Sequence, residues 1–409
     1  MDRLTFRLKK FFPEQLHPRI FLVGGMVRDA LLGVECQDVD LAAAVPADEL
    51  TSLGFRLVES KSTPNIYFLF SKEFGKIEVT WLSSPDELAA DLERRDFTVN
   101  AMALGFDGAL IDPLGGKLDL ERRLLRPCGA TSLSDDPIRI FRAFRFECEG
   151  WRLDGKTETA LARRDWPDDL KQIPVERFSQ EMLKALAKED PTRFFRRMLQ
   201  FRAGASFLPE LFQMPEVPAG PPRHHPEGDL FTHSMQVLER MAGQTADTTA
   251  RFCALFHDLG KLFTPKEHYP KHHGHDAFGA EAAVPFCQRL RLPISLQRAL
   301  QAANRLHTTA NRWEELRDAT KIKLALNAMK GGIASFLPLI VAADCGGIMP
   351  GWEEVLGVAS LNAAQLGVDP AVFEDPRFTP EKIQQLIMQH RVQELKRQRQ
   401  KAFNRDEGG

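Results

Sequence analysis

The sequence contains few features of secreted or membrane proteins. No apolar run among its 409 residues approaches the roughly 18 residues that a membrane-spanning helix needs. The N-terminus, MDRLTFRLKKFFPEQLHP, is charged throughout and lacks the apolar stretch and cleavage site of a secretory signal. We therefore expect a cytoplasmic protein that makes no membrane contact.

Cysteine clusters and a strong net charge are also missing. The six cysteines are scattered and form no Cys-x-x-Cys pair, which argues against a disulfide framework and against a zinc-thiolate site. A net charge of −2 argues against a protein that coats nucleic acid without specificity. Arginines do crowd the region between Arg139 and Arg202, so a local basic surface is compatible with the composition.

The chain is too long for one ordinary core, and two to four domains are expected. In the first part, short β-rich runs alternate with turns and predict a small mixed sheet. A hairpin is expected around Asp107-Gly108, because Asp-Gly supplies the positive φ of a tight turn. The predicted strands are Ile20–Val23, Val39–Val45, Phe55–Glu59, Ile66–Phe70, Lys76–Trp81, Ala103–Phe106 and Ala109–Ile111.

Strand signals nearly vanish after about Asp136, and helical periodicity replaces them. The fold class is therefore α+β, with a mixed α/β head followed by helical domains. Helices are predicted at Pro137–Cys148, Thr157–Arg164, Pro174–Ala187 and Pro191–Phe201. We divide the chain into a head (1–125), a helical neck (126–210), a proline-rich linker (211–228), a second helical domain (229–365) and a charged helical tail (366–409).

The segment from Phe21 to Ala42 indicates a phosphate site. A predicted strand runs into Gly24-Gly25, and a helix begins immediately after these glycines. Glycine lets the backbone approach a phosphate, and a helix N-terminus presents free N–H groups to an anion. Arg28, in the first turn of this helix, adds a charged donor.

Two carboxylates follow on the next predicted strand. Asp38 and Asp40 are two residues apart, so on a strand they project from the same face. Adjacent carboxylates repel unless a cation lies between them, and oxygen ligands suit Mg²⁺. Glu78, on the last strand of the group, is a candidate third ligand. A triphosphate at the glycine turn would then lie beside a metal that activates an RNA 3′-hydroxyl, with Asp38 and Asp40 as catalytic residues.

Five strings resemble, in order, the motifs of the class II tRNA nucleotidyltransferase and bacterial poly(A) polymerase family. The first is GG-x-VRD-x-LLG followed by D-x-D. The others are RRDFTVNA from Arg94, Asp112-Pro113 with Gly115-Gly116 and Asp119-Leu120, Asp135-Asp136-Pro137-Ile138-Arg139, and Glu176-Arg177 with Glu181. The resemblance implies a transferase with tRNA and CTP as partners, and ATP in members that complete CCA. It implies that the second motif contacts the nucleotide's ribose, with Arg95, Asp96 and Asn100 in the nucleotide site.

The fourth motif suggests how a base is chosen. Asp136 and Arg139 are three residues apart and would share one face of a helix. Cytosine and adenine both carry an amine beside a ring acceptor nitrogen, which a carboxylate and a guanidinium can bind together. Uracil and guanine would leave acceptors unpaired, at a cost on the order of a few kcal/mol. Arg142, one turn further, is placed to reach the triphosphate. An ordinary salt bridge within the helix is the alternative.

One family feature is missing. Members that complete CCA carry a flexible loop between the strand that holds Glu78 and the RRDFT motif, whereas here the connection is only Leu82–Glu93. By resemblance, this absence marks the CC-adding branch, which adds two cytidines and leaves the terminal adenosine to a separate A-adding enzyme. Full CCA addition remains an alternative, and poly(A) synthesis is less favoured.

Histidines and aspartates in the second half form a second candidate site. An apolar helix ends in His257-Asp258, where charges are costly unless they bind metal or pair with each other. The order of these residues resembles the HD phosphohydrolase superfamily, which implies a site for Ni²⁺, Mn²⁺, Co²⁺ or Mg²⁺. The candidate ligands are His233, His257, Asp258, His275, His307 and Asp344. In a competing interpretation, hydrolysis of a nucleotide or cyclic phosphate here is the main activity and the head is regulatory.

Overall fold

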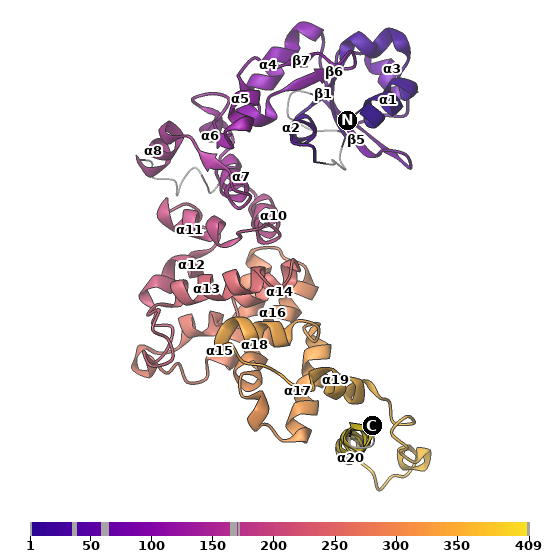
Figure 1. Cartoon of the computed structure of the whole chain (residues 1–409), viewed down its shortest axis with the longest axis vertical. Coiled ribbons are helices and arrows are strands. Elements are labelled where there is room, and N and C mark those ends of the chain that lie inside the picture. Colours follow the sequence, from indigo (N-terminus) through magenta and orange to yellow (C-terminus); the bar gives the residue numbers. More distant parts are fainter. Residues whose placement is uncertain (1, 35–38, 59–64, 164–169, 171, 407–409) are drawn as a thin grey trace. The chain divides into compact units, whose positions relative to one another are not determined.

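The computed structural model describes residues 2–34, 39–58, 65–163, 170 and 172–406. The chain forms two compact units, residues 1–172 and 173–409. The first unit contains the mixed sheet and the second is built from helices (Figure 1), so the α+β class is confirmed. The finer division into five segments stays a prediction.

The sheet of the first unit has seven strands in the order β3-β4-β5-β2-β1-β6-β7. β2 and β5 pair in parallel, and the other neighbours are antiparallel. The strands are β1 (Ile20–Val23), β2 (Val39–Ala43), β3 (Arg56–Leu57), β4 (Ile66–Ser71), β5 (Gly75–Trp81), β6 (Ala103–Gly105) and β7 (Leu110–Ile111). Each predicted strand and the hairpin are present, and β2 stops short of Val45 because Pro46 caps the next helix and has no N–H for the ladder.

The two faces of the sheet differ in burial because side chains alternate along each strand. Tyr67, Ile77 and Val79 are buried on one face, whereas their neighbours on β4 and β5 are partly or fully exposed. On the exposed face, Leu88 and Leu92 of α4 (Leu88–Glu93) cover one end of the strands and form a core cluster that includes the sheet. Toward the other end of this face, Phe70 of β4 and Lys76 of β5 are exposed.

Short helices complete the first unit. They are α1 (Asp2–Phe11), η1 (Glu14–Arg19), α2 (Gly25–Leu31), α3 (Ala47–Ser52), η2 (Pro85–Glu87), η3 (Thr98–Asn100), α5 (Gly116–Glu121), α6 (Ser132–Asp135), α7 (Ile138–Glu147) and α8 (Gly155–Arg163). A second, two-stranded sheet joins β8 (Leu124–Leu125) to β9 (Arg152–Leu153). α2 and α7 begin at the predicted positions, and they carry the candidate phosphate and base residues.

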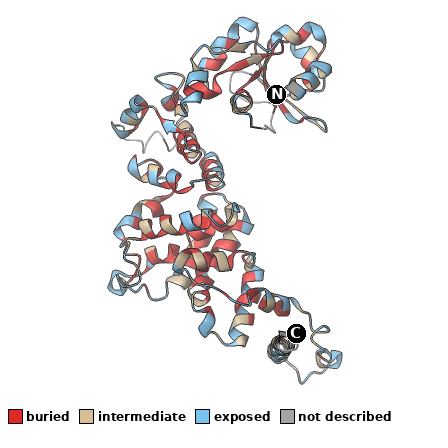
Figure 2. Ribbon diagram, in the orientation of Figure 1, coloured by how far each residue is buried: buried red, intermediate tan, exposed pale blue. Residues whose placement is uncertain are grey.

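The second unit packs its helices around a buried centre, as the red residues in Figure 2 show. α14 and α18 contact each other and both contact α13 and α16, and α15 packs along α16. The helices are α10 (Val175–Leu186), α11 (Thr192–Gln200), α12 (Pro209–Gln213), η4 (Met214–Glu216), α13 (Leu230–Ala242), α14 (Thr248–Leu255), η5 (Leu259–Phe263), η6 (Lys266–His268), α15 (His275–Arg289), α16 (Ile294–Ala310), η7 (Trp313–Glu315), α17 (Asp318–Gly331), α18 (Leu337–Cys345), α19 (Trp352–Ser360), η8 (Pro370–Phe373) and α20 (Pro380–Asp406).

The proline-rich segment is a packed part of the second unit rather than a free spacer. It contains α12 and η4, and it buries Leu211, Met214 and Ala219. Pro218 also forms a β-bridge with Asp229, which holds the end of the segment against the start of α13. The prolines restrict the backbone but do not keep it from the core, because apolar side chains are interspersed among them.

The charged tail helix α20 packs against α17 and α19. Arg399 pairs with Asp318 at 2.7 Å and with Glu354 at 3.1 Å, one acidic residue from each partner helix. Among the described residues, no helix combines the length and the hydropathy needed to cross a membrane.

Candidate functional site

The glycine turn, Asp40 and Arg95 converge in the first unit. Gly24 adopts a φ of 73°, which only glycine reaches without strain, and α2 begins at the next residue. A Cβ on Gly24 would lie 2.8 Å from Nη1 of Arg95 and 3.6 Å from Oδ2 of Asp40. Asp91 accepts from Nη2 of Arg95 at 3.0 Å and holds the guanidinium in this place. A helix N-terminus, a guanidinium and a carboxylate therefore surround one point.

Asp40 and Glu78 are neighbours because β2 and β5 pair in parallel register. Paired positions on adjacent strands share a face of the sheet, so both carboxylates face the same side. Lys76 pairs with Glu78 at 2.7 Å and partly neutralises it. Asp38, the other predicted ligand, lies outside the described residues. The oxygen donors of Asp40 and Glu78 suit Mg²⁺, and their role as ligands stays a prediction.

Asp96 is the centre of a buried polar network. It is 7% exposed and accepts hydrogen bonds from the backbone N–H of Phe97, from Nδ2 of Asn100 and from Nε of Arg142 at 2.8–2.9 Å. Oδ1 of Asn100 in turn accepts from Nη1 of Arg28 at 2.6 Å. Burial alone would raise the pKa of Asp96, but Arg142 and these bonds hold it below its ordinary value. The network links α2 to α7.

The network occupies Arg142 and Asp96, which were both expected to contact a nucleotide. Arg142 was expected at a triphosphate, yet its Nη2 lies 2.7 Å from Oδ2 of Asp96. Asp96 was expected at a ribose, yet its oxygens are occupied by protein donors. In this arrangement the two residues hold the segments that carry Arg28 and Arg139, and their expected contacts with a nucleotide stay predictions.

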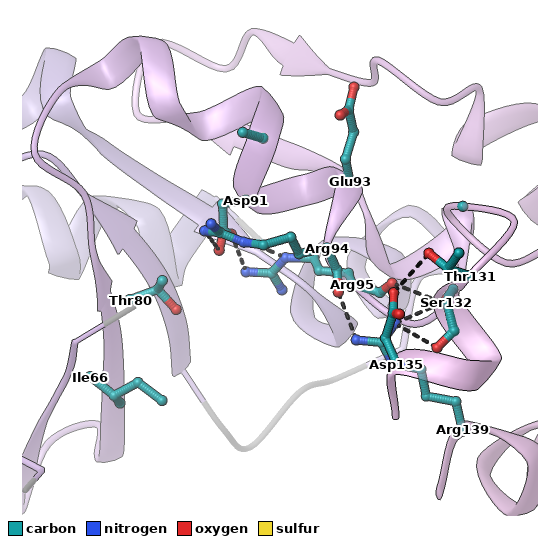
Figure 3. Close-up of a pocket in the computed structure, with 12 residues that line it drawn as sticks. Ile66, Thr80, Asp91, Glu93, Arg94, Arg95, Thr131, Ser132, Asp135 and Arg139 are labelled. Atoms are coloured by element: carbon teal, nitrogen blue, oxygen red, sulfur yellow. Dashed lines mark hydrogen bonds and ion pairs between the residues drawn. The ribbon is translucent and has the colours of Figure 1, made fainter. Parts of the chain in front are cut away.

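Asp136 and Arg139 do not share a helix face. Asp136 has an extended backbone at the end of α6, because the residue before a proline disfavours the helical region, and α7 begins only at Ile138. Arg139 donates to the hydroxyl of Ser132 at 2.7 Å and to the carbonyl of Arg94 at 2.7 Å (Figure 3). The shared-face expectation is wrong, whereas the role of each residue in base recognition stays a prediction.

Arg139 lines a cavity of about 750 Å³ in the first unit (Figure 3). This volume suits a ligand of nucleotide size. Its wall combines sheet residues Ile66 and Thr80 with Arg94, Arg95 and Asp135. Thr131 donates to Asp135 at 2.9 Å and orients this carboxylate.

The second unit brings all six predicted HD residues together. Asp258 lies at the centre, with Nε2 atoms of four histidines 3.3–3.6 Å from its oxygens. Oδ1 of Asp344 lies 3.2 Å from His233 and 3.5 Å from His257. The six residues come from α13, α15, α16, α18 and the turn after α14, so residues far apart in sequence meet in one place.

The histidines are oriented as metal ligands are. Nδ1 of His257 lies 2.8 Å from the carbonyl of Ala254, and those of His275 and His307 also lie against backbone carbonyls. Such contacts fix a proton on Nδ1 and leave Nε2 as the ligand atom. Nε2 of His233, Nε2 of His257 and Oδ1 of Asp258 are buried without a hydrogen-bond partner. Because buried polar atoms normally have hydrogen-bond partners, these unpaired nitrogen and oxygen atoms fit a divalent metal.

The pKa shifts of the HD residues indicate that their surroundings favour a positive charge in this place. Burial would lower the pKa of His257, but Asp258 and Asp344 raise it to about 10. Burial would raise the pKa of Asp258, but Lys261 and His257 hold it well below its usual range. The two carboxylates thus stay ionised in a buried place, as metal ligands must.

Three residues near this centre were missed by the sequence interpretation. Nδ1 of His233 lies 2.8 Å from Oε1 of Glu227, and the same oxygen lies 2.9 Å from Nδ1 of His225. Lys261 is buried and pairs with Asp258 at 2.6 Å. Glu227 and His225 belong to the proline-rich segment, and Lys261 follows His257-Asp258 in the same short run of sequence. Only that proximity to the His-Asp pair could have signalled Lys261.

Comparison with known proteins identifies both units. Residues 20–85 and 70–126 match a poly(A) polymerase head domain, and residues 230–328 match an HD domain. Residues 156–214 match a probable RNA- and SrmB-binding site of polymerase A. A multifunctional CCA protein of Methylococcus capsulatus is 36% identical over 357 residues, covering 82% of this chain and 83% of the relative. The chain belongs to the multifunctional CCA protein family.

Other members of this family and solved structures agree. A multifunctional CCA protein of Aromatoleum aromaticum is 35% identical, covering 75% of this chain and 78% of the relative. A CCA-adding enzyme solved with CTP has the same fold, with a TM-score of 0.65, 22% identity and coverage of 96% and 90%. A Thermotoga maritima CCA-adding enzyme complexed with tRNA gives a TM-score of 0.63 at the same identity and coverage.

Replacing Asp96 with asparagine should destabilise the first unit. Asp96→Asn keeps the size of the side chain but removes the charge that pairs with Arg142. Hydrogen bonds to a charged group contribute roughly 1.5–3 kcal/mol, so we expect a loss of about 2 kcal/mol at pH 7. Amide hydrogen exchange of residues 97–105 would measure it, because these amides report on this unit by itself.

The same variant gives a pH dependence with a defined sign. The pKa of Asp96 is lowered in the folded state. Its stabilisation is therefore complete above the unfolded pKa of about 4 and is lost as pH falls through the folded pKa. The difference in the free energy of unfolding between wild type and Asp96→Asn should become smaller as the pH is lowered from 7 to 3. An equal difference at both pH values would show that the charge of Asp96 contributes nothing.

Removing Glu227 should weaken metal binding by the HD centre. Glu227→Ala deprives Nδ1 of His233 of its acceptor and frees the ring to turn. Loss of such a partner typically costs 10- to 100-fold in metal affinity, which titration calorimetry with Mn²⁺ would measure. Glu239→Ala, on the exposed side of α13, is the matched control and should bind as wild type does. Unchanged affinity in Glu227→Ala would show that His233 is held by other contacts.

Proposed function

We propose that this protein transfers CMP from CTP to the 3′ end of tRNA and stops after two cytidines. The observation that carries the proposal is the convergence of the Gly24 turn, Arg95 and Asp40 beside a cavity of nucleotide size, in a chain that belongs to the multifunctional CCA protein family. Its structural neighbours include CCA-adding enzymes solved with CTP, with ATP and with tRNA, which agrees with this substrate class.

The proposed reaction is a single displacement at phosphorus. The 3′ oxygen of the RNA forms a bond to the α-phosphorus of CTP, the bond to pyrophosphate breaks, and the hydroxyl proton passes to solvent. Bound Mg²⁺ would stabilise the negative charge that develops on the phosphate oxygens. The N-terminus of α2 and Arg95 would hold the phosphates, and Asp40 with Glu78 would hold the metal. The arginine-rich neck would bind tRNA through its backbone phosphates.

The limit of two cytidines rests on the connection from β5 to α4. It runs through η2 directly into α4, so it has no room for a flexible loop. The backbone N–H of Ser83 donates to Glu87 at 2.9 Å, and its hydroxyl donates to the same carboxylate at 2.6 Å. Trp81 donates from Nε1 to the carbonyl of Val45 at 2.8 Å. A connection without a flexible loop is suited to one nucleotide shape, which favours CC addition over full CCA addition and leaves the adenosine to a separate enzyme.

A second activity is proposed for the HD centre, namely hydrolysis of phosphate esters. The orphaned Nε2 and Oδ1 atoms at the floor of a 600 Å³ cavity support it. Water would attack phosphorus, the ester P–O bond would break, and the leaving oxygen would take a proton. Bound metal would supply the activated water, and Lys261 would hold the central aspartate ionised. Ni²⁺, Mn²⁺, Co²⁺ and Mg²⁺ are the candidate metals.

Product length tests the two-cytidine limit. The purified protein is given a tRNA that ends at the discriminator base, first with CTP and then with CTP plus ATP. We expect growth by about two residues in both reactions, because the rigid connection favours one nucleotide shape. Gel analysis with single-nucleotide resolution measures it.

A tRNA that already ends in CC, given ATP alone, is the control and should not be extended. Growth to a third residue in either reaction would overturn the CC-adding proposal while leaving nucleotidyl transfer intact.

Substitutions should separate the two activities. Asp40→Ala is expected to lower nucleotide addition by at least ~100-fold, because a metal ligand is lost, and to leave phosphodiester hydrolysis unchanged. His257→Ala should do the reverse. Both rates are measured on the same preparations.

Asp107→Ala, on the exposed hairpin turn, and His268→Ala, on the exposed η6, are the matched controls. If Asp40→Ala still extends RNA at the wild-type rate, the assignment of the first site is wrong.

A further inference from the structure

A row of side chains crosses the sheet on the face that carries Asp40. Asp40 on β2 pairs with Glu78 on β5, Glu78 pairs with Phe68 on β4, and Phe68 pairs with Arg56 on β3. Paired residues on neighbouring strands share a face, so these four side chains form one line. We call this line the cross-strand row. Gly24 lies beside Asp40, on the β1 side of the row.

Phe68 of this row and the neighbouring Phe70 are aromatic residues outside the buried core. Phe70, two residues further along β4, shares the face of Phe68, and the two rings contact edge to face with centroids 5.7 Å apart. Phe70 is 72% exposed and Phe68 is only partly buried. Tyr67, on the opposite face of the same strand, is buried. Phe68 and Phe70 therefore offer two adjacent aromatic rings to a ligand on the face that carries Asp40.

We propose that Phe68 and Phe70 form a stacking platform for the 3′-terminal nucleosides of the acceptor RNA. This inference rests on the proposed nucleotidyl transfer and assigns the acceptor side of that site. Unpaired bases stack on aromatic side chains without regard to sequence, which suits an end that changes with each addition.

The order of groups along the row matches the geometry of the reaction. The attacking oxygen and the leaving pyrophosphate lie roughly in line, on opposite sides of the α-phosphorus. The glycine turn, where the phosphates would bind, is on the β1 side of Asp40, and the aromatic pair is on the β4 side. Since strands lie about 4.8 Å apart, Phe68 is about 10 Å from Asp40, the span of one nucleoside.

Charge at this end of the sheet also suits RNA. Arg56 is exposed next to Phe68, and Lys76 pairs with Glu78, so basic groups border the rings. Phosphates that follow the terminal nucleoside would meet these cations. The cavity lined by Ile66 and Thr80 adjoins the row on the same face, which joins the platform to the nucleotide site. A stable interface with a protein partner requires a wider apolar patch than two rings, which favours RNA as the ligand.

Substitutions of Phe70 test the platform with the full chain. Phe70→Ala should raise the KM for tRNA on the order of tenfold and leave the KM for CTP unchanged, because stacking on one base is lost. Phe70→Tyr should restore the wild-type KM, whereas Phe70→Leu, apolar but without a π-face, should not. Phe6→Ala, another exposed phenylalanine of the first unit, is the matched control and should behave as wild type.

A binding signal independent of catalysis separates this inference from the proposed function. In Phe70→Trp, an added tRNA that lacks CCA should quench fluorescence beyond the change seen in wild type. Wild-type protein that adds no cytidine would overturn the proposed function itself. Normal addition by wild type, with an unchanged KM for tRNA in Phe70→Ala and no extra quenching, would overturn the platform alone. If Phe70→Ala left the KM for tRNA unchanged but disrupted a complex with another protein, the rings would be assigned to that protein partner. This result would also overturn the inference.

Discussion

A carboxylate buried with its own cation organises the first unit. Asp96 is nearly inaccessible, so its charge is tolerable only because Arg142, Asn100 and a backbone N–H surround it. Asn100 also accepts a hydrogen bond from Arg28, which lies in the helix that follows the glycine turn. The phosphate end and the base end of the candidate site are thereby held in one geometry. These side chains hold one another in place, and their contacts with a nucleotide stay a prediction.

The second unit also contains a buried carboxylate that neighbouring positive groups and hydrogen-bond donors stabilise. Asp258 is also a buried carboxylate, with Lys261 and four imidazoles around it. There, however, the surrounding atoms are not mutually satisfied, since Nε2 of His233 and of His257 have no hydrogen-bond partner. A satisfied network is a structural support, whereas an incomplete one is a place for a ligand. This difference separates the Asp96 network from the HD centre.

The sequence interpretation succeeded where one local pattern suffices. Alternating strands, the Asp-Gly hairpin and the start of α2 follow from neighbours within a few residues, and the structure has them. It failed where a proline changes the outcome. Asp136 precedes Pro137 and so cannot join α7. The proline-rich segment, whose role as a linker stays a prediction, buries Leu211 and places Glu227 beside His233. Composition describes backbone stiffness but not what a segment packs against.

Residue order by itself determined the family motifs, the α+β class and the identity of the six HD residues, because each depends on spacing along the chain. Tertiary structure alone decided which residues meet across elements. The parallel pairing of β2 with β5 places Glu78 beside Asp40, and the packing of α13 against α18 places His233 beside Asp344. Contacts between residues far apart in sequence depend on how elements pair and pack, and no local pattern encodes that.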